Sequence, residues 1–219
     1  PSNLRSRDVP PLGQTTHLRT KCTNGVLAAE ELMVVIIGGN SRFRVAWKSD
    51  RGLVRTVNED SVLVDASLGL FAVADGMGGH KAGSVASRIA VGTCAEVVGQ
   101  NQAHESDATG LLNEAILAAH RAIMAEALVN PDCEEMGTTI VAALFAQRDS
   151  VVIGHVGDSR AYVIEGGSIG ALTRDHTFLA EWLKDGQITP AAARTHPARH
   201  GLFMALGIDD EVEPELKSI

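Results

Sequence analysis

Three acidic motifs in the sequence each lie next to an apolar stretch that has the pattern of a β-strand. The first, RTVNED, brings Arg55, Glu59 and Asp60 together just before the apolar residues SVLVD. Asp75 ends the apolar run LGLFAVAD, and Asp158 follows another apolar run in GHVGDSR. Carboxylates gathered in this way are suited to hold hard cations such as Mg²⁺ or Mn²⁺. Taken alone, NED and GDSR are more often simple exposed turns.

Gly76, Gly78 and Gly79 follow Asp75 at once. Glycine leaves room and tolerates positive φ, so Gly76 can turn its carbonyl toward the point that the Asp75 carboxylate reaches. Carboxylate and carbonyl oxygens together are typical ligands of hard cations. The alternative is a tight strand-to-helix turn that needs glycine only for packing. The spacing excludes a P-loop, because Lys81 precedes the last glycine of GGHKAGS, and it also excludes a GxGxxG dinucleotide loop.

Two further side chains suit the chemistry of phosphate esters. The planar guanidinium of Arg55 matches phosphate oxygens. Histidine titrates near neutral pH, so His80 in the glycine loop is suited to give a proton to a leaving alkoxide. The one GxSxG string, GGSIG at residues 166–170, is not followed by a helical pattern as a nucleophile elbow requires. A metal-activated water is therefore the expected nucleophile. The motifs predict metal-assisted hydrolysis of a phosphate ester. Arg160 in the third motif is expected either to pair with Asp158 or to form a structural ion pair.

The elements around these motifs predict an α+β fold. The segments SVLVD and LGLFAVAD, joined by ASLG, predict a hairpin, and RFRVAWK before them predicts a half-buried strand. Helices are predicted over about 83–98 and after an N-cap at Ser106 or Asp107. The apolar runs GTTIVAALFA, SVVIGHVG and AYVIEGG predict a three-stranded meander, followed by short helices in HTFLAEWLKDG and TPAAARTHP. Strands and helices do not alternate, which favours antiparallel sheets with a helical pair packed on one face.

Composition excludes several classes of protein. The 219 residues carry a net charge of −8 and are 45% apolar, which favours a single globular domain and argues against nucleic-acid binding. Three widely spaced cysteines without a CxxC indicate reduced thiols and a cytoplasmic protein. Apolar runs are too short to span a membrane. Residues 1–40 are rich in Pro, Ser and Thr and are expected to form a poorly ordered leader before the domain at 41–219.

Six motifs follow one another along the chain: GLVRTVNEDS, VADGMGGHKAGSVAS, MGTTIVAAL, GHVGDSRAYVI, LTRDHT and HPARHGLFMALG. As a set they resemble the bacterial branch of the metal-dependent type 2C protein serine/threonine phosphatases, from about Arg42 to Gly207. The resemblance implies a central antiparallel β-sandwich flanked by helical pairs, in α-β-β-α layers. It also implies hydrolysis of phosphoserine and phosphothreonine by a water that bridges two Mn²⁺ or Mg²⁺ ions.

The same resemblance assigns ligands to the two metals. Asp75 resembles the carboxylate that bridges both ions. The Gly76 carbonyl and Glu59 resemble ligands of the second metal, and Asp60 lies at or just behind that shell. Asp158 resembles the ligand of a third, weaker metal site.

Other roles follow from the resemblance as well. Arg55 matches the phosphate-binding arginine, and His80 matches the histidine proposed as proton donor. Residues from about 173 to 200 resemble a mobile flap beside the active site that selects substrates. Phosphorylated proteins made by a serine/threonine kinase are the expected partners, and nucleic acid and membrane are not. The chain is expected to be monomeric.

Family members continue past the ALG segment into further strands and a helix, with two later aspartates that complete the first metal site. Here Ile219 stands twelve residues after Gly207, and neither later motif is present. The resemblance therefore predicts that the C-terminal strands are missing, in either a fragment or a natural truncation. Two alternatives to an active protein phosphatase stay open. One is an inactive phosphatase-like module that binds phosphoprotein in regulation, and the other is a phosphoesterase acting on small molecules.

Overall fold

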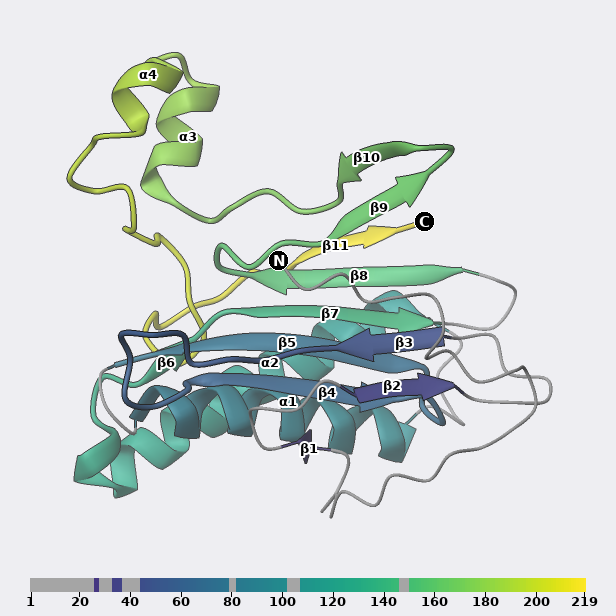
Figure 1. Cartoon of the computed structure of the whole chain (residues 1–219). Coiled ribbons are helices and arrows are strands. Elements are labelled where there is room, and N and C mark those ends of the chain that lie inside the picture. Colours follow the sequence, from purple (N-terminus) through teal and green to yellow (C-terminus); the bar gives the residue numbers. More distant parts are fainter. Residues whose placement is uncertain (1–25, 28–32, 37–43, 79–81, 102–106, 146–149) are drawn as a thin grey trace.

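The computed structural model of the chain describes residues 26–27, 33–36, 44–78, 82–101, 107–145 and 150–219. Within these residues the centre of the molecule is a seven-stranded antiparallel sheet with the order β1-β4-β5-β7-β8-β11, in which β6 also pairs with β5 (Figure 1). Its strands are β1 (Val26–Leu27), β4 (Asp60–Asp65), β5 (Leu70–Met77), β6 (Gly137–Thr138), β7 (Ile140–Phe145), β8 (Val151–Val156) and β11 (Glu215–Ser218).

The predicted hairpin is present as β4 and β5. The two strands pair antiparallel from Asp60 opposite Asp75 to Asp65 opposite Leu70. Along β5 the buried residues alternate with more exposed ones, as expected when one face of a strand packs on a core. Asp75 belongs to the face that does not pack on the helices. The alternation therefore places this carboxylate on the outer face of the sheet.

Two long helices, α1 (Ala82–Asn101) and α2 (Ala108–Val129), pack on the inner face of this sheet. Asp107 caps α2 by accepting the N–H of Thr109 at 3.0 Å, while Ser106, the other predicted cap, lies outside the described residues. The predicted apolar face of α2 is fully buried, so this expectation is confirmed; it consists of Leu112, Ile116, Ala119 and Ile123. No helix of the described residues combines the length and the apolar character that crossing a membrane needs.

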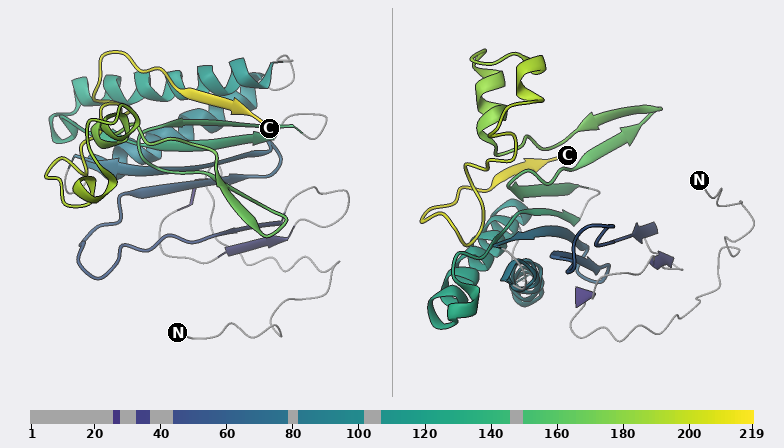
Figure 2. Two further views of the ribbon diagram at one scale, coloured as in Figure 1. Left: turned by 90° about the horizontal axis from the view of Figure 1, so that it is seen from above. Right: turned by 60° about the vertical axis from the view of Figure 1, so that its left-hand side comes forward.

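A small second layer lies across the outer face of the main sheet. It consists of β2 (Met33–Ile36) paired with β3 (Arg44–Trp47), and Figure 2 shows it on the side opposite the helices. Side chains of β3 and of the main sheet line an apolar groove between the two layers, Trp47 and Phe71 among them. The predicted α+β architecture with antiparallel sheets is therefore present. Of the expected four layers, the described residues form one helical layer, one full sheet and part of a second sheet.

One expected strand pairing is wrong. AYVIEGG was predicted to extend the meander after β8, but it forms β9 (Tyr162–Glu165), which pairs with β10 (Ser168–Ala171) in a separate two-stranded sheet. The edge of β8 is instead taken by β11, from the acidic C-terminal tail. An apolar strand pattern shows that a segment can enter a sheet, but it does not identify the neighbouring strand.

The segment predicted as a flap, residues 173–200, contains the helices α3 (Phe178–Lys184) and α4 (Pro190–Ala193). Both project away from the sheet in Figure 1. Thr177 and Thr189 cap them through their side-chain oxygens, which is the usual N-cap chemistry. The rings of Phe178, Trp182 and His196 contact one another in sequence and tie the two helices together.

Candidate metal centre

Asp60 and Asp75 lie directly opposite each other at the ends of β4 and β5. Residues paired in this way project to the same face of the sheet, so both carboxylates lie on its outer face and both are exposed. Like charges opposite each other are unfavourable. Partial burial, and next the charge of Asp60, raise the pKa of Asp75, and Arg55 partly offsets them. The fold thus holds together two carboxylates that repel each other.

Glu59 precedes Asp60 and is anchored through its backbone. Its carbonyl accepts the N–H of Gly76 at 3.2 Å and the hydroxyl of Ser87 on α1 at 2.6 Å. The side chain is 13% exposed, and its Oε2 lies 3.7 Å from Nη1 of Arg55. Its other oxygen, Oε1, is buried and accepts no hydrogen bond among the described residues. A buried carboxylate oxygen without a donor is costly, and it has the character of a metal ligand.

Gly76 and Gly83 let β5 approach the start of α1 closely. A Cβ at Gly76 would lie 2.0 Å from the carbonyl oxygen of Gly83, and a Cβ at Gly83 would lie 2.6 Å from Oε1 of Glu59. Neither contact leaves room for a side chain. The packing role predicted for Gly76 is therefore confirmed, while its carbonyl as a metal ligand stays a prediction.

Asp158 lies in the turn formed by residues 157–160, here called the Asp158 turn. It is exposed, and burial followed by the charge of Asp175 raises its pKa, with a further contribution from Asp75. The turn also lies close to the end of β5, because the hydroxyl of Thr139 lies 3.1 Å from the backbone nitrogen of Asp75 and 2.7 Å from the hydroxyl of Ser159. The third acidic motif of the sequence thus faces the same region as the first two.

The three neighbours of Asp158 are held by residues from elsewhere in the chain. The ring nitrogen Nδ1 of His176 accepts the backbone N–H of Gly157 at 3.2 Å. The backbone N–H of His176 donates to the carbonyl of Gly157 at 3.0 Å. The hydroxyl of Ser159 lies 2.7 Å from that of Thr139.

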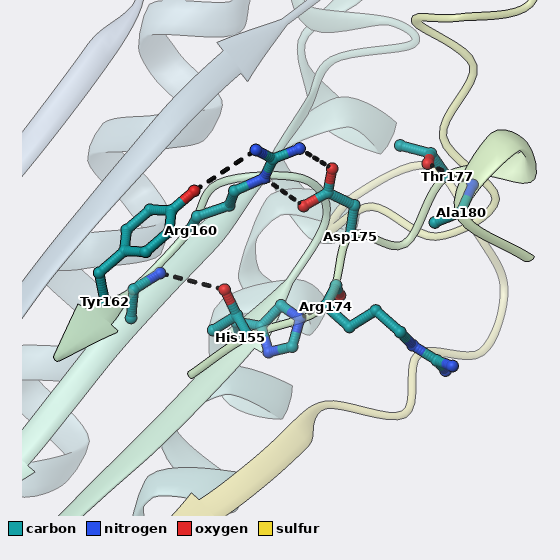
Figure 3. Close-up of polar contacts among 9 residues, drawn as sticks. His155, Arg160, Tyr162, Arg174, Asp175, Thr177 and Ala180 are labelled. Carbon is teal, nitrogen blue, oxygen red and sulfur yellow. Dashed lines mark hydrogen bonds and ion pairs between the residues drawn. The ribbon is translucent and has the colours of Figure 1, made fainter. Parts of the chain in front are cut away.

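Figure 3 shows how the last residue of the turn, Arg160, lies between Tyr162 and Asp175. Its guanidinium forms a two-point ion pair with Asp175, in which Nε lies 2.6 Å from Oδ1. The hydrogen bonds to Asp175 raise the already high pKa of Arg160 further. The sequence left open whether Arg160 lies beside Asp158 or forms a structural ion pair. The structure shows the ion pair, with Asp175.

The structure brings most of the predicted site residues together. Arg55, Glu59, Asp60, Asp75 and Gly76 meet at the ends of β4 and β5. The Asp158 turn is joined to this group through the hydroxyl of Thr139. His80 lies outside the described residues. Sequence reasoning missed the supporting residues, which are Thr139, Asp175 and His176. These residues bond to partners far away in the chain, so no local pattern indicates their role. The only signal was that they belong to the motifs MGTT and LTRDH.

A second group of possible ligands lies where β8 meets β11. His155 and His176 are 2% and 4% exposed, and their ring nitrogens and a Glu215 oxygen lie within 4.8 Å of one another. Nε2 of His155 lies 2.8 Å from the carbonyl of Arg174, which can only accept, so this nitrogen carries its proton (Figure 3).

The hydrogen bonds of His176 argue against a metal in this group. Its Nδ1 accepts the N–H of Gly157, so the proton of the neutral ring sits on Nε2, which faces Glu215 at 3.7 Å. A ligating histidine normally donates a hydrogen bond from its other nitrogen rather than accepting one. The two rings also stack, with centroids 4.5 Å apart, so their in-plane lone pairs do not converge. We interpret this group, the histidine cluster, as a structural support that joins β8, β11 and residue 174.

The chain matches the family model described as protein phosphatase 2C over residues 54–183. This range contains the whole of the Asp158 turn and every residue at the ends of β4 and β5, here called the strand-end site: Arg55, Glu59, Asp60, Asp75 and Gly76. It also includes α1, α2 and the first part of the flap.

Curated relatives are protein phosphatases. The serine/threonine protein phosphatase PstP of Mycobacterium tuberculosis is 43% identical over 173 residues, covering 79% of this chain and 32% of the relative. The serine/threonine phosphatase stp of Listeria monocytogenes is 37% identical over 172 residues, covering 76% of this chain and 68% of the relative. The chain thus spans about a third of the length of the first relative and about two thirds of the second.

Solved structures show the same fold. The crystal structure of the M. tuberculosis phosphatase PstP/Ppp superposes with a TM-score of 0.69 at 42% identity, covering 78% of this chain and 70% of that one. The catalytic domain of PstP in complex with two manganese ions gives a TM-score of 0.66 at 41% identity, covering 78% and 69%. The family model, the similar sequences and the similar structures all identify the same kind of protein. The chain therefore belongs to the protein phosphatase 2C family.

Proposed function

We propose that this chain carries the active site of a metal-dependent protein serine/threonine phosphatase, which hydrolyses phosphoserine and phosphothreonine in proteins. The observation that carries the proposal is the placement of Asp60 directly opposite Asp75, beside the buried Oε1 of Glu59, which accepts no hydrogen bond from the described part of the chain. Crowded carboxylates of this kind are stabilised by divalent cations. Family membership supports the same conclusion, and the manganese-bound relative supports the choice of metal.

The residues present fit Mn²⁺ or Mg²⁺, which both prefer oxygen ligands. Asp75, Glu59 and the Gly76 carbonyl would hold the two ions, with Asp60 at or just behind that shell. Asp158 would hold a third, weaker one. When bound, such ions supply Lewis acidity and an activated water at neutral pH.

The protein's own groups bind and orient the substrate. The side chain of Arg55 is 60% exposed, and its contact with Glu59 at 3.7 Å is long. A long contact with one exposed partner is weak, so the guanidinium is available to bind two phosphate oxygens. His80 would give the proton that the leaving serine or threonine oxygen needs. Burial raises the pKa of Cys94 to about 12, so this thiol is no competing nucleophile.

The flap would contact the protein part of the substrate. Its helices α3 and α4 project from the sheet, and its base at Asp175 and His176 is bonded to the Asp158 turn. Substrates are therefore expected to be phosphorylated proteins, which can touch both the strand-end site and the flap.

Hydrolysis of p-nitrophenyl phosphate with and without Mn²⁺ tests the proposal. We expect Mn²⁺-dependent release of product, lost in Asp75→Asn and retained in Asp65→Asn. The second variant carries the same substitution at the other end of β4, where an asparagine oxygen can still accept from the N–H groups of Ser67 and Leu68. Absence of Mn²⁺-dependent hydrolysis, in this chain and in the chain extended to the stop codon of its gene, would contradict the proposal.

Two further outcomes separate the alternatives. Retained binding of phosphopeptides without turnover would favour the phosphoprotein-binding module. Faster hydrolysis of phosphorylated metabolites than of phosphopeptides would favour a small-molecule phosphoesterase.

A further inference from the structure

Thr139 lies between the two regions that carry the candidate metal ligands. It separates β6 from β7, and the residue is only 2% exposed. On one side it contacts Asp75 at the end of β5, and on the other it contacts the Asp158 turn. Neither contact is part of the hydrogen bonding within a strand pair.

The contact with Asp75 involves both polar backbone atoms of that residue. The hydroxyl of Thr139 accepts the N–H of Asp75 at 3.1 Å, and the N–H of Thr139 donates to the Asp75 carbonyl at 3.0 Å. The hydroxyl of Thr138 donates to the same carbonyl at 3.0 Å. The backbone that carries the Asp75 carboxylate is therefore fixed by Thr139 at both its donor and its acceptor.

The contact with the Asp158 turn uses both branches of the threonine side chain. The hydroxyl lies 2.7 Å from that of Ser159, and because it already accepts from Asp75, its own hydrogen is free to be donated to Ser159. The methyl group fills the space beside Gly157, where an added Cβ would lie 2.6 Å from Thr139 Cγ2. Thr139 thus touches the residues on both sides of Asp158.

We propose that Thr139 is a positioning residue that fixes the carboxylates of Asp75 and Asp158 relative to each other. Through this link, binding of a divalent cation at one carboxylate prepares the other. The inference rests on the proposed function, because the separation of the two carboxylates matters only if cations bind between or beside them. Thr139 itself would contact neither metal nor substrate and would act through the backbones of its neighbours.

Threonine is the natural residue type with both features that this position uses. Valine keeps the shape and the methyl group against Gly157 but removes the hydroxyl that joins Asp75 to Ser159. Serine keeps the hydroxyl and loses the methyl group. The pair Thr139→Val and Thr139→Ser therefore separates hydrogen bonding from packing.

Amide hydrogen exchange of the full 219-residue chain without metal tests the link directly. In Thr139→Val we expect exchange at the Asp75 amide and across the Asp158 turn to be about tenfold faster than in the parent protein, the size of one lost hydrogen bond. Thr139→Ser is expected to stay close to the parent. Exchange in the Asp158 turn that is unchanged in Thr139→Val would overturn the proposal.

Titration with Mn²⁺, followed by electron paramagnetic resonance, then separates positioning from a merely structural role. We expect Thr139→Val to bind Mn²⁺ about tenfold more weakly, because the ligands are less well fixed. Thr139→Ser should bind like the parent. Ile116→Val is the control, since it removes one buried methyl group in the helix core and should lower stability without changing Mn²⁺ affinity.

The outcomes of the two experiments are distinguishable. Faster exchange with unchanged Mn²⁺ affinity in Thr139→Val would overturn the positioning role. A parent protein that binds no Mn²⁺ would contradict the proposed function, while faster exchange in Thr139→Val alone would still establish the link between Asp75 and the Asp158 turn.

Discussion

At the ends of β4 and β5, two carboxylates are held opposite each other on an exposed face, whereas the histidine cluster of His155, His176 and Glu215 lies largely buried between β8 and β11. Both regions gather side chains that ligate metals. In the first, Arg55 only partly offsets the repulsion between the carboxylates, and Oε1 of Glu59 accepts no hydrogen bond among the described residues. In the second, the Nδ1 lone pair of His176 already accepts a hydrogen bond from the N–H of Gly157.

The pKa shifts of Asp75 and His176 show the same difference between the two regions. Burial and then Asp60 raise the pKa of Asp75, so the ionised carboxylate is destabilised and a cation would relieve it. Burial and then His155 lower the pKa of His176, so the neutral ring is the stable form and its hydrogen bonds are satisfied. A metal site therefore requires lone pairs that the fold leaves available, and proximity of suitable residue types is not enough.

The largest effect expected is that of Gly76→Ala, which tests how closely the strand ends must approach α1. The new Cβ would lie 2.0 Å from the Gly83 carbonyl and 2.7 Å from that of Glu59. Because both neighbours are backbone atoms, we expect the free energy of unfolding in urea to fall by about 3 kcal/mol. Gly92→Ala in α1, which has no atom within 4 Å of the new Cβ, should be neutral or stabilising. A loss in Gly76→Ala no larger than that in Gly92→Ala would show that the approach is not required.

Mn²⁺ affinity gives the most direct comparison of the two regions. Asp75→Asn should weaken Mn²⁺ binding by about 100-fold, equivalent to about 2.7 kcal/mol, because it removes an anionic ligand. Glu215→Gln in the histidine cluster should change the affinity by less than about twofold, within the scatter of a neutral surface substitution. Isothermal titration calorimetry measures both. A larger loss in Glu215→Gln than in Asp75→Asn would reverse our assignment of the two regions.

A smaller effect is expected from acid on the histidine cluster. Well above pH 6.5, the ordinary value for histidine, His176 is neutral in both the folded and the unfolded chain, so it adds no pH dependence to stability. As the pH falls below 6.5, the unfolded chain binds the proton first, because the folded pKa is lower, and the free energy of unfolding decreases. His176→Asn keeps an acceptor near the Nδ1 position and cannot titrate, so its stability should depend less on pH in this range.

Glu215→Gln provides the opposite change at the same place. The carboxylate of Glu215 raises the pKa of His176, so its removal should lower that pKa further and make the loss of stability in acid steeper. Urea unfolding of the parent and both variants at several pH values below 6.5 measures the slopes. Equal slopes in all three proteins would show that His176 is not the titrating group.

Local patterns in the sequence predicted the parts of the fold that depend on local interactions. The hairpin of β4 and β5, the Asp107 cap and the buried face of α2 follow from alternation, capping and helical periodicity. The partner of β8 did not follow, because an apolar strand pairs with any matching edge, and the acidic tail that forms β11 has no strand pattern. The partner of Arg160 stayed open for the same reason, since Asp175 is fifteen residues away.

Some residues of the candidate site could likewise be predicted from local patterns, and others could not. The hairpin register places Asp60 opposite Asp75, and the motifs indicated both residues as ligands. Thr139 gave no signal of its own, since a threonine within an apolar strand is ordinary. The roles of His80 and of the metal ligands, the monomeric state and the cytoplasmic location stay predictions.

The smallest expected effect is the change in stability in Asp75→Asn, which should have opposite signs without and with Mn²⁺. It tests whether a cation relieves the repulsion at the ends of β4 and β5. Without metal, Asp75→Asn removes the repulsion from Asp60 and should raise the free energy of unfolding at pH 7 by a few tenths of a kcal/mol, because exposed charges are screened. The gain should fade as the pH falls toward 3.8, the ordinary aspartate value, and vanish well below it, since the parent carboxyl is then protonated in both states. With saturating Mn²⁺ the parent should become the more stable protein, because only it binds the ion tightly. Thermal unfolding with and without Mn²⁺ measures this exchange of order, and the same order under both conditions would mean that the repulsion between the strand ends is not relieved by a cation.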